Sequence, residues 1–219
     1  MNIFKTSLLL AVGICAVSNA AKADYAVWTD VKTGAKVSFP DTWKQINNQQ
    51  PNDLITLSLP SGDDKAVCRL RADDERRFLI YPSRFEPDVR DVNFTQEFWD
   101  NYTASYDQVN VIRAQHNAGL GRGFASMTLI SFVTPPDEPR TERAGIMAVT
   151  NYYDKLYVAE CTSGLTSYRD YHQAFLGFFK SINFKKAYTE ATVGNYRNFL
   201  NEWGTIDVPF PNAVSRSTY

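Results

Sequence analysis

Most of the chain between residues 26 and 161 alternates hydrophobic and polar side chains with a period of two, as half-buried strands do. The clearest case is a hairpin. An alternating run at 54–59 leads into the turn residues Pro60-Ser61-Gly62-Asp63-Asp64, and a second run returns over 65–71. The same pattern predicts further strands at 26–29, 36–39, 109–113, 123–133, 143–153 and 155–161.

The returning run of this hairpin has two different faces. Ala66, Cys68 and Leu70 share one face, which we expect to point into the core. The opposite face carries arginines, and more follow the strand; these residues are Arg69, Arg71, Arg76 and Arg77. Arginine and aromatic residues are enriched in interface cores, and the chain has 12 tyrosines, so we predict a candidate interaction surface here. The alternative is the basic solvent face of an edge strand, which discourages aggregation.

Two segments have the spacing of amphipathic helices. One covers 94–106, with its start capped by Asn93 or Thr95, and the other covers 167–181. The stretch 72–93 between strand and helix is charged and proline-punctuated, and we expect its part at 73–77 to be a solvated loop or a helix start. Strands, hairpin, helix, antiparallel strands, hairpin and helix follow in that order, which predicts an α+β fold with a central antiparallel sheet flanked by helices.

The two ends of the chain differ from this middle part. Residues 1–23 predict a cleavable secretory signal: Lys5 precedes an uncharged stretch of about 11 residues, too short to span a bilayer, and Ala21-Lys22-Ala23 offers a small-x-small cleavage site. The alternatives are an uncleaved anchor, or a lipoprotein modified at Cys15. Residues 24–184 form the α+β domain, and residues 185–219 read as a C-terminal extension with a short helix at about 190–203.

Cleavage of this signal changes the charge and the cysteine count. The leader takes away two lysines and leaves 21 basic against 24 acidic side chains, a formal net charge of −3, which does not suit nucleic-acid binding. No later stretch is long and apolar enough for a transmembrane segment, so we expect a periplasmic or secreted protein. Cys68 and Cys161 remain, and an even pair in an exported chain predicts a disulfide; two free buried thiols are the alternative.

The opening and closing motifs resemble those of the Mog1/PsbP-like proteins. The opening is Val37-Ser38-Phe39-Pro40 followed by Asp41-Thr42-Trp43-Lys44, and the closing motif is the helix at 175–181 that runs into Ile182-Asn183-Phe184. The resemblance covers residues 25–184. It implies an α/β/α sandwich and a non-catalytic protein that binds or stabilises partners. The extension at 185–219 and the cysteine pair depart from that family's pattern.

Signatures of catalysis and of cofactor or metal binding are weak. Only His116 and His172 could act as a histidine base, and there is no Gly-x-Ser-x-Gly sequence. The glycines of 119–123 precede a predicted strand and not a helix, so we interpret them as a turn and not as a phosphate loop. Two separated thiols and two histidines make a zinc site improbable. We therefore predict no catalytic residue, no metal and no cofactor.

Three functions remain compatible with these patterns. The first is an exported binding or accessory protein without an active site, which acts on a protein partner in the cell envelope. The second is an envelope hydrolase whose acid and base are carboxylates distant in sequence. The third is a structural envelope component that docks through its extension at 185–219.

Overall fold

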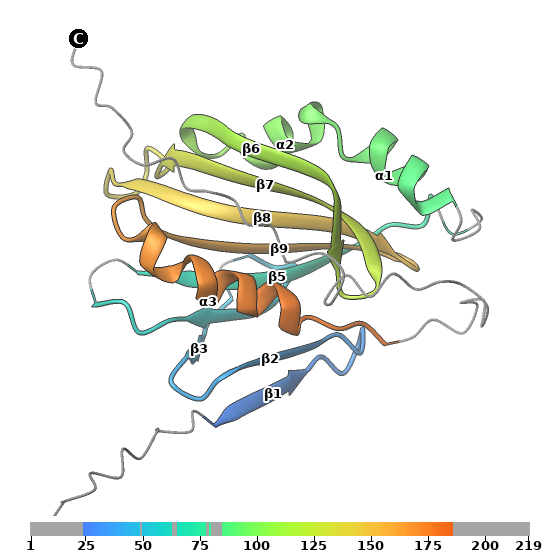
Figure 1. The fold of residues 1–219 in the computed structure, drawn as a ribbon, viewed down its shortest axis with the longest axis horizontal. Helices are drawn as coiled ribbons and strands as arrows, with labels where there is room; N and C mark the ends of the chain where they lie inside the picture. Colours follow the sequence, from blue (N-terminus) through green and yellow to red (C-terminus); the bar gives the residue numbers. More distant parts are fainter. Residues whose placement is uncertain (1–23, 49, 63–64, 78, 80–84, 186–219) are drawn as a thin grey trace, which may run out of the picture.

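The fold is a seven-stranded antiparallel sheet with helices on both faces (Figure 1). The computed structural model describes residues 24–48, 50–62, 65–77, 79 and 85–185. The leader at 1–23 and the extension from 186 onward lie outside the described residues. The strand order is β3-β4-β5-β9-β8-β7-β6. The seven strands are β3 Lys44–Ile46, β4 Asp53–Ser58, β5 Val67–Asp74, β6 Asp107–Leu120, β7 Gly123–Val133, β8 Glu142–Tyr152 and β9 Lys155–Gly164.

Two layers cover the sheet, one on each face. The long helix α3 (Tyr168–Ser181) packs on one face, next to a two-stranded ribbon of β1 (Tyr25–Thr29) and β2 (Lys36–Pro40) (Figure 1). The short helices α1 (Glu86–Asn93) and α2 (Gln96–Tyr102) lie on the other face. The predicted α+β class, with a central antiparallel sheet between helices, is confirmed.

The larger core lies between the sheet and α3. The helix contributes Tyr168, Phe175 and Phe178, which are almost fully buried, and the facing strands contribute alternate apolar residues such as Ile55 and Leu57. The smaller core lies under α1 and α2 and includes Phe94, Trp99 and Phe132. As predicted, Cys68 and Leu70 of β5 point into the larger core, and α3 begins and ends within a residue of the expected bounds.

The helix expected at 94–106 is shorter than predicted, because α2 occupies only part of that segment, and a separate helix, α1, precedes it. Helix α1 occupies the end of the charged, proline-punctuated stretch 72–93, and its first turn contains a proline, which suits a helix start. The backbone leaves the helical conformation at Phe94, whose N–H donates to the carbonyl oxygen of Arg90. Thr95 then precedes α2, which ends at Tyr102. Phe94 fits the apolar stripe because its ring packs on Phe98, although it lies outside both helices.

Strands β5 and β6 are longer than the pattern predicts. Strand β5 continues through Asp73 and Asp74, which were expected in a loop, and Asp74 is held by Lys155 of β9. Strand β6 runs to Leu120, although its second half, from Ala114, lacks alternation. It is an edge strand with three register shifts against β7, and each shift changes which residues face either side of the sheet, so the alternation of its sequence is interrupted. The turn predicted at 119–123 is confirmed at Gly121, whose φ is +59°.

Candidate functional site: a groove over the half-covered sheet

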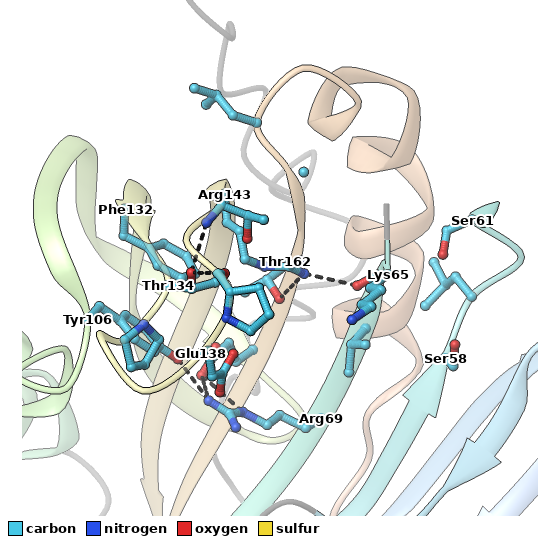
Figure 2. A pocket seen from close by; sticks show the side chains of 18 of the residues that line it. Ser58, Ser61, Lys65, Arg69, Tyr106, Phe132, Thr134, Glu138, Arg143 and Thr162 are labelled. Atoms are coloured by element: carbon cyan, nitrogen blue, oxygen red, sulfur yellow. Dashed lines mark hydrogen bonds and ion pairs between the residues drawn. The ribbon is translucent and has the colours of Figure 1, made fainter. Parts of the chain in front are cut away.

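An open groove of about 1510 Å³ lies on the sheet face that carries α2. Strands β3, β4, β5 and β9 provide the floor, because α1 and α2 cover only the part of this face nearer to β6. One side is the β4–β5 connection, with Ser61 and Lys65. The other side is the β7–β8 loop, with Thr134 and Glu138, together with Tyr106 (Figure 2).

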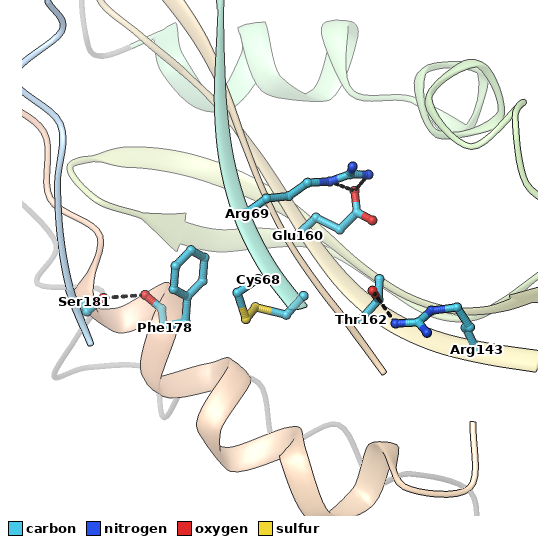
Figure 3. The surroundings of a disulfide bond; sticks show 8 residues. Cys68, Arg69, Arg143, Glu160, Thr162, Phe178 and Ser181 are labelled. Atoms are coloured by element: carbon cyan, nitrogen blue, oxygen red, sulfur yellow. Dashed lines mark hydrogen bonds and ion pairs between the residues drawn. A yellow bond between two sulfur atoms is a disulfide. The ribbon is translucent and has the colours of Figure 1, made fainter. Parts of the chain in front are cut away.

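A buried ion pair between Arg69 and Glu160 lies in the floor (Figure 3). Arg69 of β5 and Glu160 of β9 are directly opposite each other in the antiparallel ladder. The Nη2 and Nε atoms of Arg69 donate to Oε2 of Glu160 at 2.8 and 3.2 Å. The hydroxyls of Tyr102 and Tyr106 donate to Oε2 and Oε1 at 2.7 and 2.8 Å, so both carboxylate oxygens are engaged.

The electrostatics of this cluster keep Glu160 ionised. Burial alone would raise the pKa of its carboxyl group, but the charge of Arg69 and the hydrogen bonds from Arg69 and the two tyrosines outweigh burial, so the pKa is below the ordinary value. Burial and the nearby Glu160 raise the pKa of Tyr102 and of Tyr106, so both phenols stay neutral donors. A carboxylate that is ionised and fully hydrogen-bonded does not serve as a general acid.

A second ion pair continues the floor toward β4. Nε of Arg71 lies 3.3 Å from Oδ1 of Asp53, and its guanidinium lies over the ring of Tyr102, 5.3 Å from the ring centre. Oδ2 of Asp53 accepts the backbone N–H of Gln50 at 3.0 Å. Arg71 thus joins α2 to the β4 side of the sheet by a charge pair and a cation–π contact.

Both sides of the groove are held by hydrogen bonds. Nη2 of Arg143 in β8 donates to the carbonyl oxygen of Lys65 at 2.9 Å and to Oγ1 of Thr162 at 3.2 Å (Figure 2). Across the groove, the hydroxyl of Thr134 donates to the carbonyl oxygen of Pro139 at 2.7 Å and accepts the N–H of Thr141 at 2.9 Å. These bonds fix the shape of the two rims.

The disulfide between Cys68 and Cys161 lies behind the floor, on the opposite face of the sheet (Figure 3). The two cysteines are the ladder pair next to Arg69 and Glu160, and their Cα atoms are 4.1 Å apart. Their side chains are fully buried, and Phe178 of α3 lies beside them. Two neighbouring pairs of the β5–β9 ladder are therefore cross-linked on opposite faces, one by a covalent bond and one by charge.

The structure separates the four arginines predicted to share a surface. Arg69 and Arg71 line the groove, whereas Arg76 and Arg77 lie beyond the end of β5, exposed and outside the groove lining. Arg77 pairs with Glu75 at 2.5 Å. The alternative of a solvent-facing edge strand is wrong, because β5 lies between β4 and β9 and the side chains of Arg69 and Arg71 are only 17% and 14% exposed. Their role in an interface remains a prediction.

Sequence reasoning missed the partners of these arginines. Glu160 is a single acidic residue in an apolar strand, and a charge in such a position requires a buried partner. That signal indicates a buried ion pair but does not identify Arg69. Tyr102 and Tyr106 were expected on the apolar stripe of one helix. Helix α2 instead ends at Tyr102, and the hydroxyls of both tyrosines reach Glu160.

The two histidines lie outside the groove lining. Nδ1 of His116 is 3.3 Å from Oγ of Ser126, and Nδ1 of His172 is 3.1 Å from the hydroxyl of Tyr168. His172 is buried. Within the described ranges, no three His, Cys, Asp or Glu side chains come together as a metal site, and no helix is long and apolar enough to cross a membrane.

Fold and site together define an α+β protein with a groove on a half-covered antiparallel sheet. No family model matches the chain, and no curated protein matches its sequence. Among solved structures, it is similar to a cyanobacterial PsbP from Synechocystis, with 11% identity, a TM-score of 0.49, and coverage of 78% of this chain and 99% of that one.

Two other solved structures are similar at lower scores. The Ran-binding protein Mog1p of Saccharomyces cerevisiae has 8% identity and a TM-score of 0.41, with 70% of this chain and 84% of that chain covered. LpqN of Mycobacterium tuberculosis has 8% identity and a TM-score of 0.43, with 75% and 92% covered. PsbP and Mog1p carry the two names of the family that the opening and closing motifs resemble. At these low values, the likeness concerns the fold and implies nothing about ligand, partner or activity.

Proposed function

We propose that this chain is an exported, non-catalytic accessory protein that binds a segment of a protein partner of the cell envelope in the groove. One observation carries the proposal: the charged and phenolic groups of the floor are bonded to one another, beneath a wide open surface. Such a floor is rigid, and its carboxylate, Glu160, is already engaged by Arg69 and the two tyrosines. The volume of about 1510 Å³ also exceeds the roughly 300–1,000 Å³ of small-molecule pockets, which favours a polypeptide.

The rims of the groove suggest the chemistry of that segment. Lys44 and Lys65 lie on the side of β3 and the β4–β5 connection, and Asp137 and Glu138 lie on the β7–β8 loop opposite. A bound segment with acidic residues along one side and basic residues along the other would complement both rims. The arginines and tyrosines of the floor are residue types that are enriched at interface centres.

Export is supported by the cysteine pair, since a buried structural disulfide is typical of oxidising compartments. Together with the leader predicted at 1–23, it favours a periplasmic or secreted location. Intact-mass measurement of the protein recovered from the periplasmic fraction or the medium tests this. We expect the mass of residues 24–219 with one disulfide. A chain that keeps residues 1–23, or that stays in the cytoplasm, contradicts export.

Filling the groove tests the binding role. Ser58 of β4 lies in the groove lining and is half-buried, so Ser58→Trp places a large ring in the groove without entering the core. Val92 of α1 is 75% exposed and outside the groove, so Val92→Trp is the matched control. We expect affinity capture from envelope extract to recover one partner with the wild type and with Val92→Trp, and much less of it with Ser58→Trp. Equal recovery with all three, or no specific partner, would overturn the proposal.

A further inference from the structure

Three strands of the described fold have a free edge: β3 and β6 in the large sheet, and β1 in the two-stranded ribbon. The other strand of the ribbon, β2, bonds along its outer side to Asn183 and Ser181. A free edge presents unpaired backbone N–H and C=O groups that can pair with another chain. Soluble proteins protect such edges by shortness, charge, proline or β-bulges. The three edges of this protein differ in these protections.

Two of the edges are protected. Strand β3 has three residues and begins with Lys44. Strand β6 has three register shifts against β7, and it carries Asp107 and Arg113. These features interrupt regular pairing with another strand.

Strand β1 carries none of these protections. Its sequence, Tyr-Ala-Val-Trp-Thr, has no charge and no proline, and it pairs with β2 in an unbroken register from Tyr25↔Pro40 to Thr29↔Lys36. Tyr25 and Val27 are 67% and 66% exposed, although tyrosine and valine both favour strands. The other face of β1 is anchored, because Ala26 and Trp28 pack on the main core. The strand is thus held in place with an uncharged edge facing outward.

We propose that the free edge of β1 pairs antiparallel with β1 of a second copy of this chain. Two ribbons then become one four-stranded sheet, which is more stable than a two-stranded ribbon on its own. An uncharged edge pairs best with another uncharged strand. Of the three free edges only β1 is uncharged, so within this chain the matching partner strand is β1 of a second copy. A twofold axis through Val27 places Val27 opposite Val27 and Tyr25 opposite Thr29, which are favourable aromatic and β-branched pairs. The twofold also closes the assembly at two copies and prevents open-ended growth.

The test is the oligomeric state of the mature chain, residues 24–219, measured by analytical ultracentrifugation over a dilution series. We expect the wild type to be a dimer that dissociates on dilution. Val27→Lys places like charges opposite each other at the twofold axis and should raise the dimer Kd by about tenfold or more. Val92→Lys, the same change at an equally exposed valine on α1, should leave the Kd unchanged.

A charge-complementation experiment identifies the partner strand. Val27→Glu alone should weaken the dimer as Val27→Lys does, and a mixture of the two variants should form heterodimers that native mass spectrometry detects. Tyr25→Lys serves as a second disrupting variant if Val27→Lys does not fold. A wild type that is monomeric throughout the series, an unchanged Kd in both lysine variants, or no heterodimer in the mixture overturns the proposal. Capture of a different protein's strand by β1 would also contradict it.

The result is independent of the groove. Ser58→Trp should leave the dimer intact, and Val27→Lys should leave capture of the groove partner intact. A wild type that captures the groove partner but stays monomeric contradicts only the dimer, and a wild type that dimerises but captures no partner contradicts only the groove proposal.

Discussion

At the scale of single residues, Glu160 is the centre of the candidate site. Its carboxylate is 96% shielded from solvent and accepts hydrogen bonds from Arg69, Tyr102 and Tyr106. Through these bonds β5, the end of α2 and the turn before β6 all depend on one side chain of β9. A buried charge of this kind adds little net stability over an apolar pair, but loss of one partner leaves the other uncompensated.

Removal of Glu160 alone should therefore be costly. Glu160→Gln is expected to lower the free energy of unfolding by about 3 kcal/mol, because Arg69 keeps a buried charge without its counter-ion. The double variant Arg69→Met/Glu160→Gln should lose less than the sum of the two single variants. Equilibrium urea denaturation measures all four proteins. Single variants within about 0.5 kcal/mol of the wild type, as for surface substitutions, would show that the pair is not a structural centre.

The same carboxylate gives the stability a pH dependence of known sign. The pKa of Glu160 is lower in the folded protein than the ordinary value of about 4.3 in an unfolded chain. Its contribution is complete above that unfolded pKa and is lost as the pH falls through the folded pKa. The wild type should thus lose stability below about pH 4.3 more steeply than Glu160→Gln. Glu138→Gln, at an exposed carboxylate, is the control, and parallel pH profiles of wild type and Glu160→Gln would contradict the account.

At the scale of elements, the pairing of β5 with β9 joins the two halves of the sheet. The N-terminal strands β3, β4 and β5 meet the C-terminal strands only at this ladder. The disulfide and the Arg69–Glu160 pair cross-link it at neighbouring positions on opposite faces (Figure 3). The groove floor spans the same ladder, so its rigidity depends on both links.

Loss of the disulfide should weaken this junction. Cys68 and Cys161 are 93 positions apart, and closing so long a loop stabilises a protein by up to about 4.7 kcal/mol, mainly by restricting the unfolded chain. We expect Cys68→Ala/Cys161→Ala to unfold at lower urea concentration than the wild type, and reductant to destabilise the wild type only. Thiol labelling of the denatured, unreduced wild type should find no free cysteine. Two labelled cysteines, or a variant as stable as the wild type, would contradict this.

The elements differ in how far the sequence predicts them. The β4–β5 and β8–β9 hairpins follow from the alternation of the sequence and from the turn residues between their strands. Strand β6 could not be bounded in this way, because its three register shifts interrupt the alternation of buried and exposed residues. The break between α1 and α2 at Phe94 was not predicted either. Phe94 has the helical spacing of apolar residues, but its backbone is not in the helical conformation.

The candidate site was predicted only in part. The alternation of side chains along a strand correctly predicted that Arg69 and Arg71 share one face and that Cys68 points into the core. That β5 is a central strand depends on its pairing with β9, more than 90 positions later, and no local pattern encodes such a contact. The groove itself exists because α1 and α2 leave the β3 side of this face uncovered, and this follows only from how helices and sheet pack together.

At the scale of the whole molecule, the two faces of the sheet differ in how fully they are covered. The face under α3 contains the larger core and the disulfide, and the ribbon beside it presents the free edge of β1. The face with α1 and α2 is only half covered and contains the groove. A dimer through β1 would carry two grooves, and a partner with two binding segments would then bind more tightly than to one copy.

Site-specific photo-crosslinking in intact cells tests the groove most directly. A photo-reactive residue is placed at Ser58 on the floor, at Glu138 on the β7–β8 loop, or at Val92 on α1 as the control, one position per protein. The account predicts that Ser58 and Glu138 both form an adduct with the same envelope protein, identified by mass spectrometry, and that Val92 does not. Absence of an adduct at both groove positions, or equal labelling from Val92, would contradict it.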